Sequence, residues 1–260
     1  MASDLTGGRA LVSGSDSWLR AAGRWLREIA IVVVGALVAS TLLRLFIVQL
    51  FVIPSESMEN TLLVTDRVAV QKLAPFQRGD VIVFRDTLGW LEPAREDGPL
   101  EEAMVFVGLA PDRSVNHLIK RVIGLAGDHV ACCDARGRVT VNGTALNEPA
   151  YLYTDPATGR QVDPSSMSFD VVVPGGTVFV LGDHRDRSQD SRCHLDDDTG
   201  GGPPWSHAFI PQANIVGTAI AVVYPFSRFQ AMSRPATFEN VPVGPAPPAA
   251  PVVKGPEPDC

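Results

Sequence analysis

The feature that most constrains this chain is an apolar run close to its N-terminus. Residues 29–43, IAIVVVGALVASTLL, carry no charge, and Arg44 separates them from a second apolar stretch that continues to Pro54. A helix needs about twenty apolar residues to cross a bilayer, a length that the run reaches if it extends to Val48. An arginine near the end of a span can extend its side chain to the headgroups. The run therefore predicts a transmembrane anchor over 29–48.

Arginines on one side of this run predict its orientation. Arg20, Arg24 and Arg27 lie just before it, and the positive-inside rule places such residues in the cytoplasm. Residues 1–28 are then a cytoplasmic segment. A cleaved signal peptide is the alternative, since the charged and apolar regions have the right order. We favour an uncleaved anchor because the apolar run is long and no clean A-x-A site follows it. Either interpretation exports residues 46–260.

The rest of the chain has the composition of a folded protein. Of its 260 residues, 45% are hydrophobic and 20% are charged, which excludes wholesale disorder. The net charge is −7, and no cluster of Lys and Arg stands out. We therefore expect no nucleic-acid partner.

Short runs rich in β-branched residues predict a β fold from Leu45 to about Phe229. The runs VIVF, HLIKRVIGL, RVTVNG, DVVV, TVFVLGD and NIVGTAIAVVYP are each bounded by Gly, Pro, Asn or Asp. We expect a mainly β, mostly antiparallel body. Residues 86–116 interrupt it with a polar stretch and one apolar patch, MVFVGLA, for which helix and strand are both open. Residues 231–260 are rich in Pro and Ala, which predicts a disordered tail.

The segment HLIKRVIGL places two cations in an apolar strand. With a period of two, Lys120 and Arg121 point to opposite faces that are otherwise apolar. At least one cation is then expected in a poorly solvated place, where a lysine has a lowered pKa and can act as a general base. An edge strand with both cations in water explains the segment equally well.

Two serines after the apolar segment are candidate nucleophiles. Ser55 and Ser57 follow Pro54 in the sequence PSESM. A serine becomes a nucleophile when a base removes its proton, and a lysine can supply that base without a histidine. Alone the signal is weak, because a serine after a proline is more often found in a turn or a helix cap.

A stretch of mixed charge, GDHRDRSQDSR at 182–192, follows the apolar strand TVFVL. Alternating charges in this position favour an ion-pair network that holds a site in shape, although a solvated loop has the same composition. His184 next to Asp183 also suggests a Ser-His-Asp arrangement. Adjacent residues on a strand point to opposite sides, so those two are poorly placed to pair.

We expect neither a metal nor a cofactor. The chain has four cysteines and no CxxC motif. The best candidates for a ligand set, His194, Asp196, Asp198 and His207, fall at no recognised spacing. A solvated acidic loop explains them better.

Taken together, these segments resemble bacterial type I signal peptidases, the membrane-bound Ser/Lys enzymes that release exported proteins from their signal peptides. Four stretches carry the resemblance, in the order that the family has: PSESMENTL at 54–62, RGDVIVF at 78–84, KRVIGLAGD at 120–128 and GDHRDRSQDSR at 182–192. The expected anchor lies just upstream of the first. The match covers roughly residues 29–225.

The resemblance implies roles for the polar residues of these motifs. Ser57 would be the nucleophile and Lys120 its general base. Ser55 would bind the oxyanion together with the backbone N–H of Ser57. The remaining matches are residues that support this dyad: Ser188, which orients the lysine, and the bracing ion pair of Asp190 and Arg192.

The resemblance also implies an arrangement of the chain. A catalytic β core over 49–128 and 175–230 would carry a smaller β domain inserted over 129–174. The protein would span the bacterial plasma membrane once, with its N-terminus in the cytoplasm and its catalytic domain outside. It would need no cofactor.

The implied partners are the lipid bilayer and the signal peptides of preproteins. A signal peptide would lie extended between the stretch at 51–54 and the strand at 117–119 and add a strand. Small apolar-walled pockets would admit only small residues such as Ala before the cut. The residues expected to contact it are Phe51, Ile53, Pro54, Leu118 and Ile119.

Two positions depart from the family's motifs. His184 stands where Asn is usual, and Glu56 stands where Gly is common. Neither belongs to the dyad, and they leave specificity in doubt more than reaction type. A different anchored Ser/Lys processing peptidase is an alternative. An inactive anchored binding protein is another, although it has little reason to keep Ser57, Lys120 and Ser188.

The last expectation from the sequence is a disulfide. An exported domain can keep one, and Cys193 follows the expected brace, while Cys132 and Cys133 begin the expected insert. Adjacent residues on a strand point opposite ways, so only one of the two can face Cys193. We favour Cys133, and two buried free thiols are an equal alternative.

Overall fold

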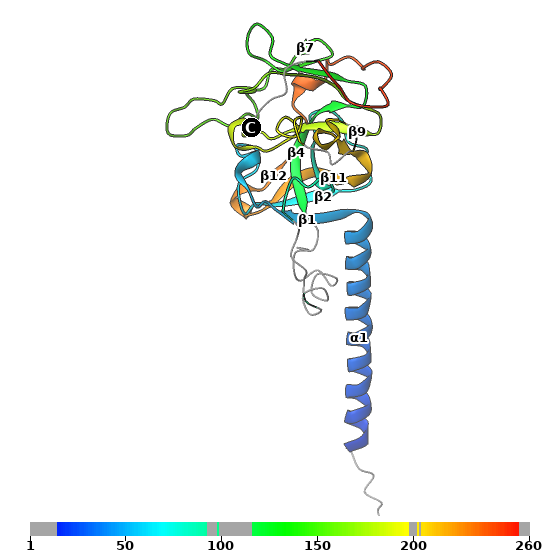
Figure 1. Ribbon diagram of the computed structural model, residues 1–260. Helices are drawn as coiled ribbons and strands as arrows, with labels where there is room; N and C mark the ends of the chain where they lie inside the picture. The colour runs from blue at the N-terminus through cyan, green and yellow to red at the C-terminus, as the bar shows by residue number, and fades with distance from the viewer. Residues whose placement is uncertain (1–14, 93–97, 99–115, 198–201, 203, 255–260) are drawn as a thin grey trace, which may run out of the picture. The chain divides into compact units, whose positions relative to one another are not determined.

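The computed structural model describes residues 15–92, 98, 116–197, 202 and 204–254 (Figure 1). The chain divides into two compact units, Met1–Leu43 and Arg44–Cys260. The apolar patch MVFVGLA, which the sequence places within 86–116, lies outside the described residues.

The first unit contains most of helix α1, whose bounds are Ser15–Phe46 and whose last three residues belong to the second unit. Apolar side chains along it are exposed, as Ile31, Val32 and Val34 illustrate with 61%, 69% and 58% of their surface accessible. In the part of the chain that the structure describes, no helix has the length and apolarity needed to cross a membrane. The transmembrane character expected of residues 29–48 is therefore not shown.

The second unit is built on an antiparallel sheet, which has eight strands among the described residues. The strand order is β1-β2-β11-β3-β4-β9-β10, and β12 pairs with β11. The expectation of a mainly antiparallel β body is confirmed. The strands are β1 Val48–Val52, β2 Arg67–Gln71, β3 Val81–Arg85, β4 His117–Leu125, β9 Thr177–Leu181, β10 Ile210–Pro211, β11 Ile215–Tyr224 and β12 Gln230–Ala231.

Strand β4 lies inside this sheet. Lys120 faces Ile82 of β3 across one ladder, and Arg121 faces Leu181 of β9 across the other. Because both edges of β4 are paired and both cations are only 3% exposed, the edge-strand alternative is wrong. The apolar run that carries the two cations forms a central strand because its side chains are buried on both faces of the sheet.

A second antiparallel sheet has the order β13-β8-β5-β6-β7. Four of its strands come from the segment 129–174, and the fifth comes from the C-terminal part of the chain. In Figure 1, β7 lies at the opposite end of this unit from β1. The bounds are β5 His129–Cys132, β6 Thr140–Val141, β7 Thr144–Ala145, β8 Phe169–Val172 and β13 Val252–Val253.

Single turns of 3-10 helix connect these strands. Two of them, η1 and η2, carry residues of the candidate site. Their bounds are η1 Glu56–Met58, η2 Arg185–Arg187, η3 Ser206–Ala208, η4 Gln212–Asn214, η5 Phe226–Arg228 and η6 Ala236–Phe238.

The described part of the C-terminal segment is ordered, so the expectation of a disordered tail is wrong for residues 231–254. Phe238 and Val241 are 4% and 7% exposed and complete the apolar core beneath the second sheet. Strand β13 pairs with β8, and Pro242 accepts a hydrogen bond of 2.8 Å from Asn142. The Pro-rich composition misleads because this segment packs against an existing sheet and needs no core of its own.

The predicted disulfide is also wrong. Cys132 and Cys133 are bonded to each other, so neither pairs with Cys193, which is itself disulfide-bonded. The prediction rests on regular strand geometry at both adjacent residues. Strand β5 ends at Cys132, so the rule that neighbours point to opposite faces does not extend to Cys133.

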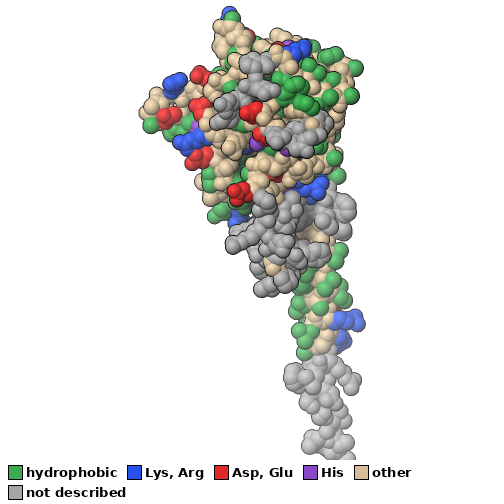
Figure 2. Space-filling model, in the orientation of Figure 1, with side chains coloured by type: hydrophobic (Ala, Val, Ile, Leu, Met, Phe, Trp, Pro, Cys, Tyr) green, Lys and Arg blue, Asp and Glu red, His purple; other side chains and the backbone are tan. Residues whose placement is uncertain are grey.

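The surface of the β unit mixes both signs of charge. On the face shown in Figure 2, acidic and basic side chains are interspersed among apolar and neutral ones. Several arginines are matched with carboxylates, for example Arg138 with Asp134 at 2.7 Å and Arg234 with Asp80 at 3.1 Å. These pairs offset much of the positive charge that the sequence scatters along this unit.

Candidate active site

Ser57 lies in the single helical turn η1, just after strand β1. Ser55 precedes the turn in an extended conformation, with φ −137° and ψ 165°. Met58 and Leu62 are fully buried, and the N–H of Leu62 donates to the carbonyl of Met58 at 2.8 Å. The two apolar side chains anchor the turn and hold Ser57, itself 6% exposed, against the sheet.

The structure brings the two serines and the strand lysine together. Lys120 Nζ donates a hydrogen bond of 2.6 Å to Ser57 Oγ. Ser55 Oγ lies 3.4 Å from the same Ser57 Oγ. A hydroxyl, a buried amine and a second hydroxyl thus converge on one point from segments that are 63 residues apart.

The surroundings of Lys120 favour its neutral form. Burial lowers the pKa of Lys120 from 10.5 to about 8, an effect that Asp190 and Asp183 oppose in part and Arg192 reinforces. Among the described residues, no carboxylate forms an ion pair with the Lys120 amine. A group with a pKa of about 8 is neutral in roughly a tenth of the molecules at pH 7 and in about half at pH 8, so the amine can accept a proton.

Asp190 and Arg192 form a fully buried ion pair next to this amine. Arg192 Nε and Nη2 donate to the two Asp190 oxygens at 2.8 and 2.9 Å. Arg192 Nη2 also donates to the carbonyl of Arg185, and Gly182 N–H donates to Asp190 at 3.0 Å. Burial is the largest single effect and opposes ionisation of Asp190, but Arg192 together with the Gly182 N–H and Ser188 outweighs it, and the pKa of Asp190 is lowered.

Ser188 does not make the contact that the resemblance implies. Its Oγ is buried and has no hydrogen-bond partner with good geometry among the described residues, Lys120 included. The hydroxyl lies close enough to Asp190 to help lower the pKa of that carboxyl. Gly182 makes room for this loop, because a Cβ there would lie 2.2 Å from Ser188 Oγ and 2.5 Å from the Ser57 carbonyl oxygen.

The residues expected to contact substrate lie on two sides of the sheet. Ile53 and Ile119 belong to one buried apolar cluster, and Phe51 packs against it. Leu118 packs on the other face, and Pro54 is exposed. The Phe51 and His117 rings are 5.1 Å apart, so the ends of β1 and β4 are close although the two strands are not neighbours in the sheet.

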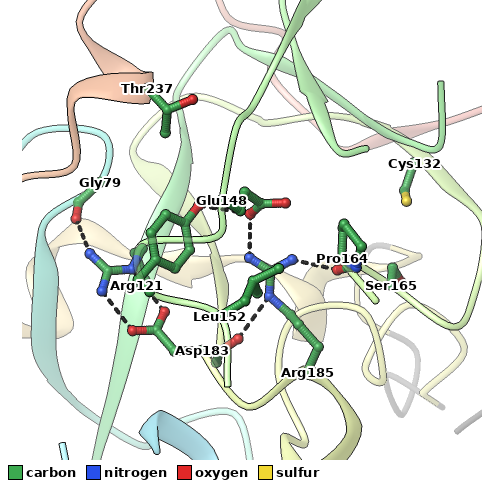
Figure 3. Close-up of polar contacts among 12 residues, drawn as sticks. Gly79, Arg121, Cys132, Glu148, Leu152, Pro164, Ser165, Asp183, Arg185 and Thr237 are labelled. Atoms are coloured by element: carbon green, nitrogen blue, oxygen red, sulfur yellow. Dashed lines mark hydrogen bonds and ion pairs between the residues drawn. The ribbon is translucent and has the colours of Figure 1, made fainter. Parts of the chain in front are cut away.

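Sequence reasoning did not assign partners to Arg121 and Asp183, which form a second buried ion pair (Figure 3). Arg121 Nε and Nη2 donate to Asp183 at 2.8 and 2.6 Å, and Nη1 donates to the Gly79 carbonyl at 2.6 Å. Burial opposes the charge of Arg121, but Asp183 outweighs it, so the pKa of Arg121 is raised. Asp183 therefore serves Arg121 and not His184, which removes the Ser-His-Asp arrangement.

A third buried ion pair joins the charged loop to the second sheet's segment. Arg185 Nη2 donates to Glu148 at 2.5 Å, and Arg185 also donates to the Pro164 carbonyl (Figure 3). Tyr151 donates to the same Glu148 oxygen at 2.7 Å, and the Arg121 guanidinium lies 4.3 Å from the Tyr151 ring centre. Glu148 and Tyr151 lie outside the four motifs. The charged loop has three arginines and three aspartates, so its composition gives no signal of either residue.

The described candidates for metal ligands do not form a ligand set. Asp197 contacts His194 at 2.6 Å and lies 3.8 Å from His207. Asp198 lies outside the described residues. Within the described ranges, no group of three or more possible ligands gathers in one place.

Comparison with known proteins extends these observations. A family model described as "Signal peptidase, peptidase S26" matches residues 25–224. Signal peptidase I of Mycobacterium tuberculosis is 38% identical over 231 residues, covering 78% of this chain and 74% of the relative. The probable signal peptidase I of Mycobacterium leprae is 35% identical over 254 residues, covering 86% of this chain and 84% of the relative.

A solved structure of a signal peptidase I from Enterococcus faecalis also matches. It is 25% identical and superposes with a TM-score of 0.34, covering 56% of this chain and 97% of the other. That superposition is too weak for a comparison of folds, so the sequence matches carry the similarity.

Proposed function

Because the chain belongs to the signal peptidase family, peptidase S26, we propose that it cleaves the signal peptides of exported preproteins with Ser57 as nucleophile and Lys120 as general base. Membership makes the chain a signal peptidase, a peptide hydrolase. The observation that supports the dyad is the 2.6 Å hydrogen bond between Lys120 Nζ and Ser57 Oγ, in a place where the lysine pKa is about 8.

The chemistry follows from these two groups. The neutral Lys120 amine takes the proton of Ser57 Oγ while that oxygen attacks the carbonyl carbon of the scissile peptide bond. The Lys120 ammonium then gives the proton to the leaving amine, and an acyl-enzyme forms. A water molecule, activated by the same amine, hydrolyses the ester and restores the Ser57 hydroxyl.

The oxyanion of the tetrahedral intermediate needs donors already in place. We assign this task to the Ser55 hydroxyl and the backbone N–H of Ser57. The 3.4 Å between the two serine oxygens supports this, because a donor so close to the nucleophile also lies near the carbonyl that the nucleophile attacks.

The buried pair of Asp190 and Arg192 keeps the lysine's surroundings rigid. Its carboxylate is held by Arg192 and by the Gly182 N–H, so Asp190 stays ionised without contacting the amine. We assign Ser188 to the same support through Asp190.

We propose that the substrate binds as an extended strand between the end of β1 and the end of β4. The 5.1 Å separation of the Phe51 and His117 rings supports this, because it places the segments that precede Ser57 and Lys120 beside each other. Added strands gain affinity from backbone hydrogen bonds, and side-chain pockets supply the choice of residue. Ile53 and Ile119 would then form an apolar wall for a small side chain.

We also propose that α1 holds the enzyme at the bacterial plasma membrane, with its N-terminus in the cytoplasm. The support is the exposure of its apolar side chains, which water disfavours, together with Arg24 and Arg27 at the start of the apolar run. Extraction of cell membranes with alkaline carbonate tests this: the protein should stay in the membrane fraction. Release into the supernatant would contradict it.

The experiment that tests the dyad is cleavage of a purified preprotein by detergent-solubilised enzyme. Ser57→Ala should lower turnover by about 10⁴-fold or more, because a nucleophile and its base act as a unit. Circular dichroism should show unchanged strand content. Near-normal turnover by this variant would remove Ser57 from the mechanism.

A further inference from the structure

His184, a departure from the family's motif, touches the nucleophile segment directly. Its backbone N–H donates a 3.1 Å hydrogen bond to the Ser57 carbonyl oxygen. Its ring Nδ1 lies 3.1 Å from a carboxylate oxygen of Glu59, the residue that ends the η1 turn. The His184 ring is thus joined to the turn that carries Ser57, and this residue is only 4% exposed.

The other side of the His184 ring is covered by Tyr153. The two rings are stacked with their centres 3.8 Å apart and their planes at 17°. Tyr153 is itself fixed, because its N–H donates to the Asp183 carbonyl at 3.1 Å and its carbonyl accepts from Val162. The ring of His184 therefore has a rigid aromatic surface on one side and the nucleophile turn at its edge.

A second contact joins the same two helical turns, but it is exposed. Arg187 of η2 pairs with Glu56 of η1, and their side chains are 62% and 47% accessible. Water and salt screen such a pair, so it does little to fix geometry. The His184 side chain is 5% accessible and Glu59 22%, so their contact is the better shielded of the two.

We propose that His184 is a positioning residue for the reaction: its ring, backed by Tyr153, fixes Glu59 and with it the η1 turn, so that Ser57 Oγ stays within hydrogen-bond distance of Lys120. This rests on the proposed role of Ser57. Misplacement of a reacting group by about 1 Å can cost 10²-fold in rate. A side chain that acts only in this way changes kcat and leaves KM nearly unaltered, because it does not touch the substrate.

Two substitutions separate the two contacts of the ring. His184→Phe keeps an aromatic ring to stack on Tyr153 but removes the hydrogen bond to Glu59. His184→Asn keeps a polar group but removes the stack. We expect each to lower kcat by a few-fold to about 10-fold and His184→Ala by about 10- to 100-fold, with KM within about two-fold of wild type. His129→Asn, at a partly exposed histidine of β5 that pairs with Asp170, is the matched control and should match the wild type.

Glu59→Gln provides a test that does not depend on replacing a buried ring. It should lower kcat less than His184→Ala does. Combined with His184→Phe it should cost no more than the larger single effect, because both changes act on the same contact. The measurement is preprotein cleavage by the full chain, with thermal unfolding of each variant recorded beside it.

Several outcomes would overturn the inference. Additive effects in the double variant, a rise in KM at constant kcat, or wild-type kcat for His184→Ala would each do so. A fall in kcat that a lower unfolding temperature and a smaller active fraction fully account for would also do so. Failure of the proposed function looks different: Ser57→Ala would then keep its activity, whatever His184 does.

Discussion

The two faces of strand β4 show that the pKa values of two neighbouring buried cations can shift in opposite directions. Lys120 and Arg121 are adjacent, and each is 3% exposed. On its face, Arg121 meets both oxygens of Asp183 and the Gly79 carbonyl, and its pKa is raised. On the opposite face, Lys120 meets a serine hydroxyl and, within the described part of the chain, no carboxylate, and its pKa falls to about 8.

The difference teaches that burial alone does not make a base. A buried cation keeps its proton when a carboxylate and other acceptors replace its lost hydration. Lys120 lacks that replacement, and lysine can lose its proton where arginine cannot. Between pH 8 and 10.5 the unfolded chain binds a proton at this residue that the folded chain does not, so the Lys120 contribution to stability rises with pH across that window.

The largest effect on catalysis is expected when position 120 carries an arginine, as position 121 already does. Lys120→Arg keeps the charge at this position but removes the group that can lose its proton. We expect preprotein cleavage to fall by about 10⁴-fold or more, in line with loss of one member of a catalytic unit.

The matched control is Lys72→Arg, at the residue just beyond strand β2, which should leave turnover near the wild-type value. Activity in Lys120→Arg together with its loss in Lys72→Arg would show that the wrong base has been assigned.

The next effect concerns the hydroxyl beside the dyad. Ser55→Ala removes one of the two proposed oxyanion donors and should lower kcat by about 10² to 10³-fold with little change in KM. Ser55→Thr keeps a hydroxyl and should retain more activity. Steady-state kinetics on one preprotein decides the point, and equal rates for both variants and the wild type would exclude Ser55 from the site.

Breaking the ion pair between Arg121 and Asp183 should mainly lower the free energy of unfolding. Asp183→Asn leaves a buried guanidinium without its carboxylate, which costs about 3–5 kcal/mol when one partner of a buried pair is removed. Urea unfolding measures the loss. An unchanged free energy of unfolding would mean that the Asp183 carboxylate is not what keeps the Arg121 charge buried.

The smallest effect on stability is expected from an ion pair whose side chains are exposed to water. Glu56→Gln removes the charge of the exposed pair with Arg187 and leaves the backbone preference of the η1 turn nearly unchanged. We expect no measurable change in the urea midpoint, because exposed pairs are screened. A loss comparable to that of Asp183→Asn would show that exposure does not separate the two kinds of pair.

Much of the fold could be predicted because its strands can be recognised from short stretches of sequence. The runs VIVF and HLIKRVIGL became β3 and β4, since β-branched residues bounded by turn formers fit buried strands. The C-terminal segment could not be predicted in the same way. Phe238 and Val241 are two apolar residues in a Pro-rich stretch. They belong to a core only because they pack against buried residues of the second sheet.

The site shows the same limit. The alternation of charges in 182–192 indicated an ion-pair network, but Glu148 and Tyr151, which complete it, stand more than thirty residues away in a segment without a motif. The pairing of Cys193 failed for a similar reason, because it depended on the course of the chain beyond the end of β5. Local patterns indicate which residues are buried, and only the tertiary structure decides which of them meet.

The central claim is that Lys120 is the neutral base for Ser57, and the pH dependence of kcat/KM tests it most directly. The rate should rise with pH along a limb whose apparent pKa is about 8, because the lysine must lose its proton in the free enzyme. The limb should be unchanged in Lys72→Arg. A limb near pH 6.5 that disappears in His184→Asn would identify a histidine base, and a rate that rises only near pH 10.5 would mean that burial does not lower the pKa of Lys120; either result would contradict the account.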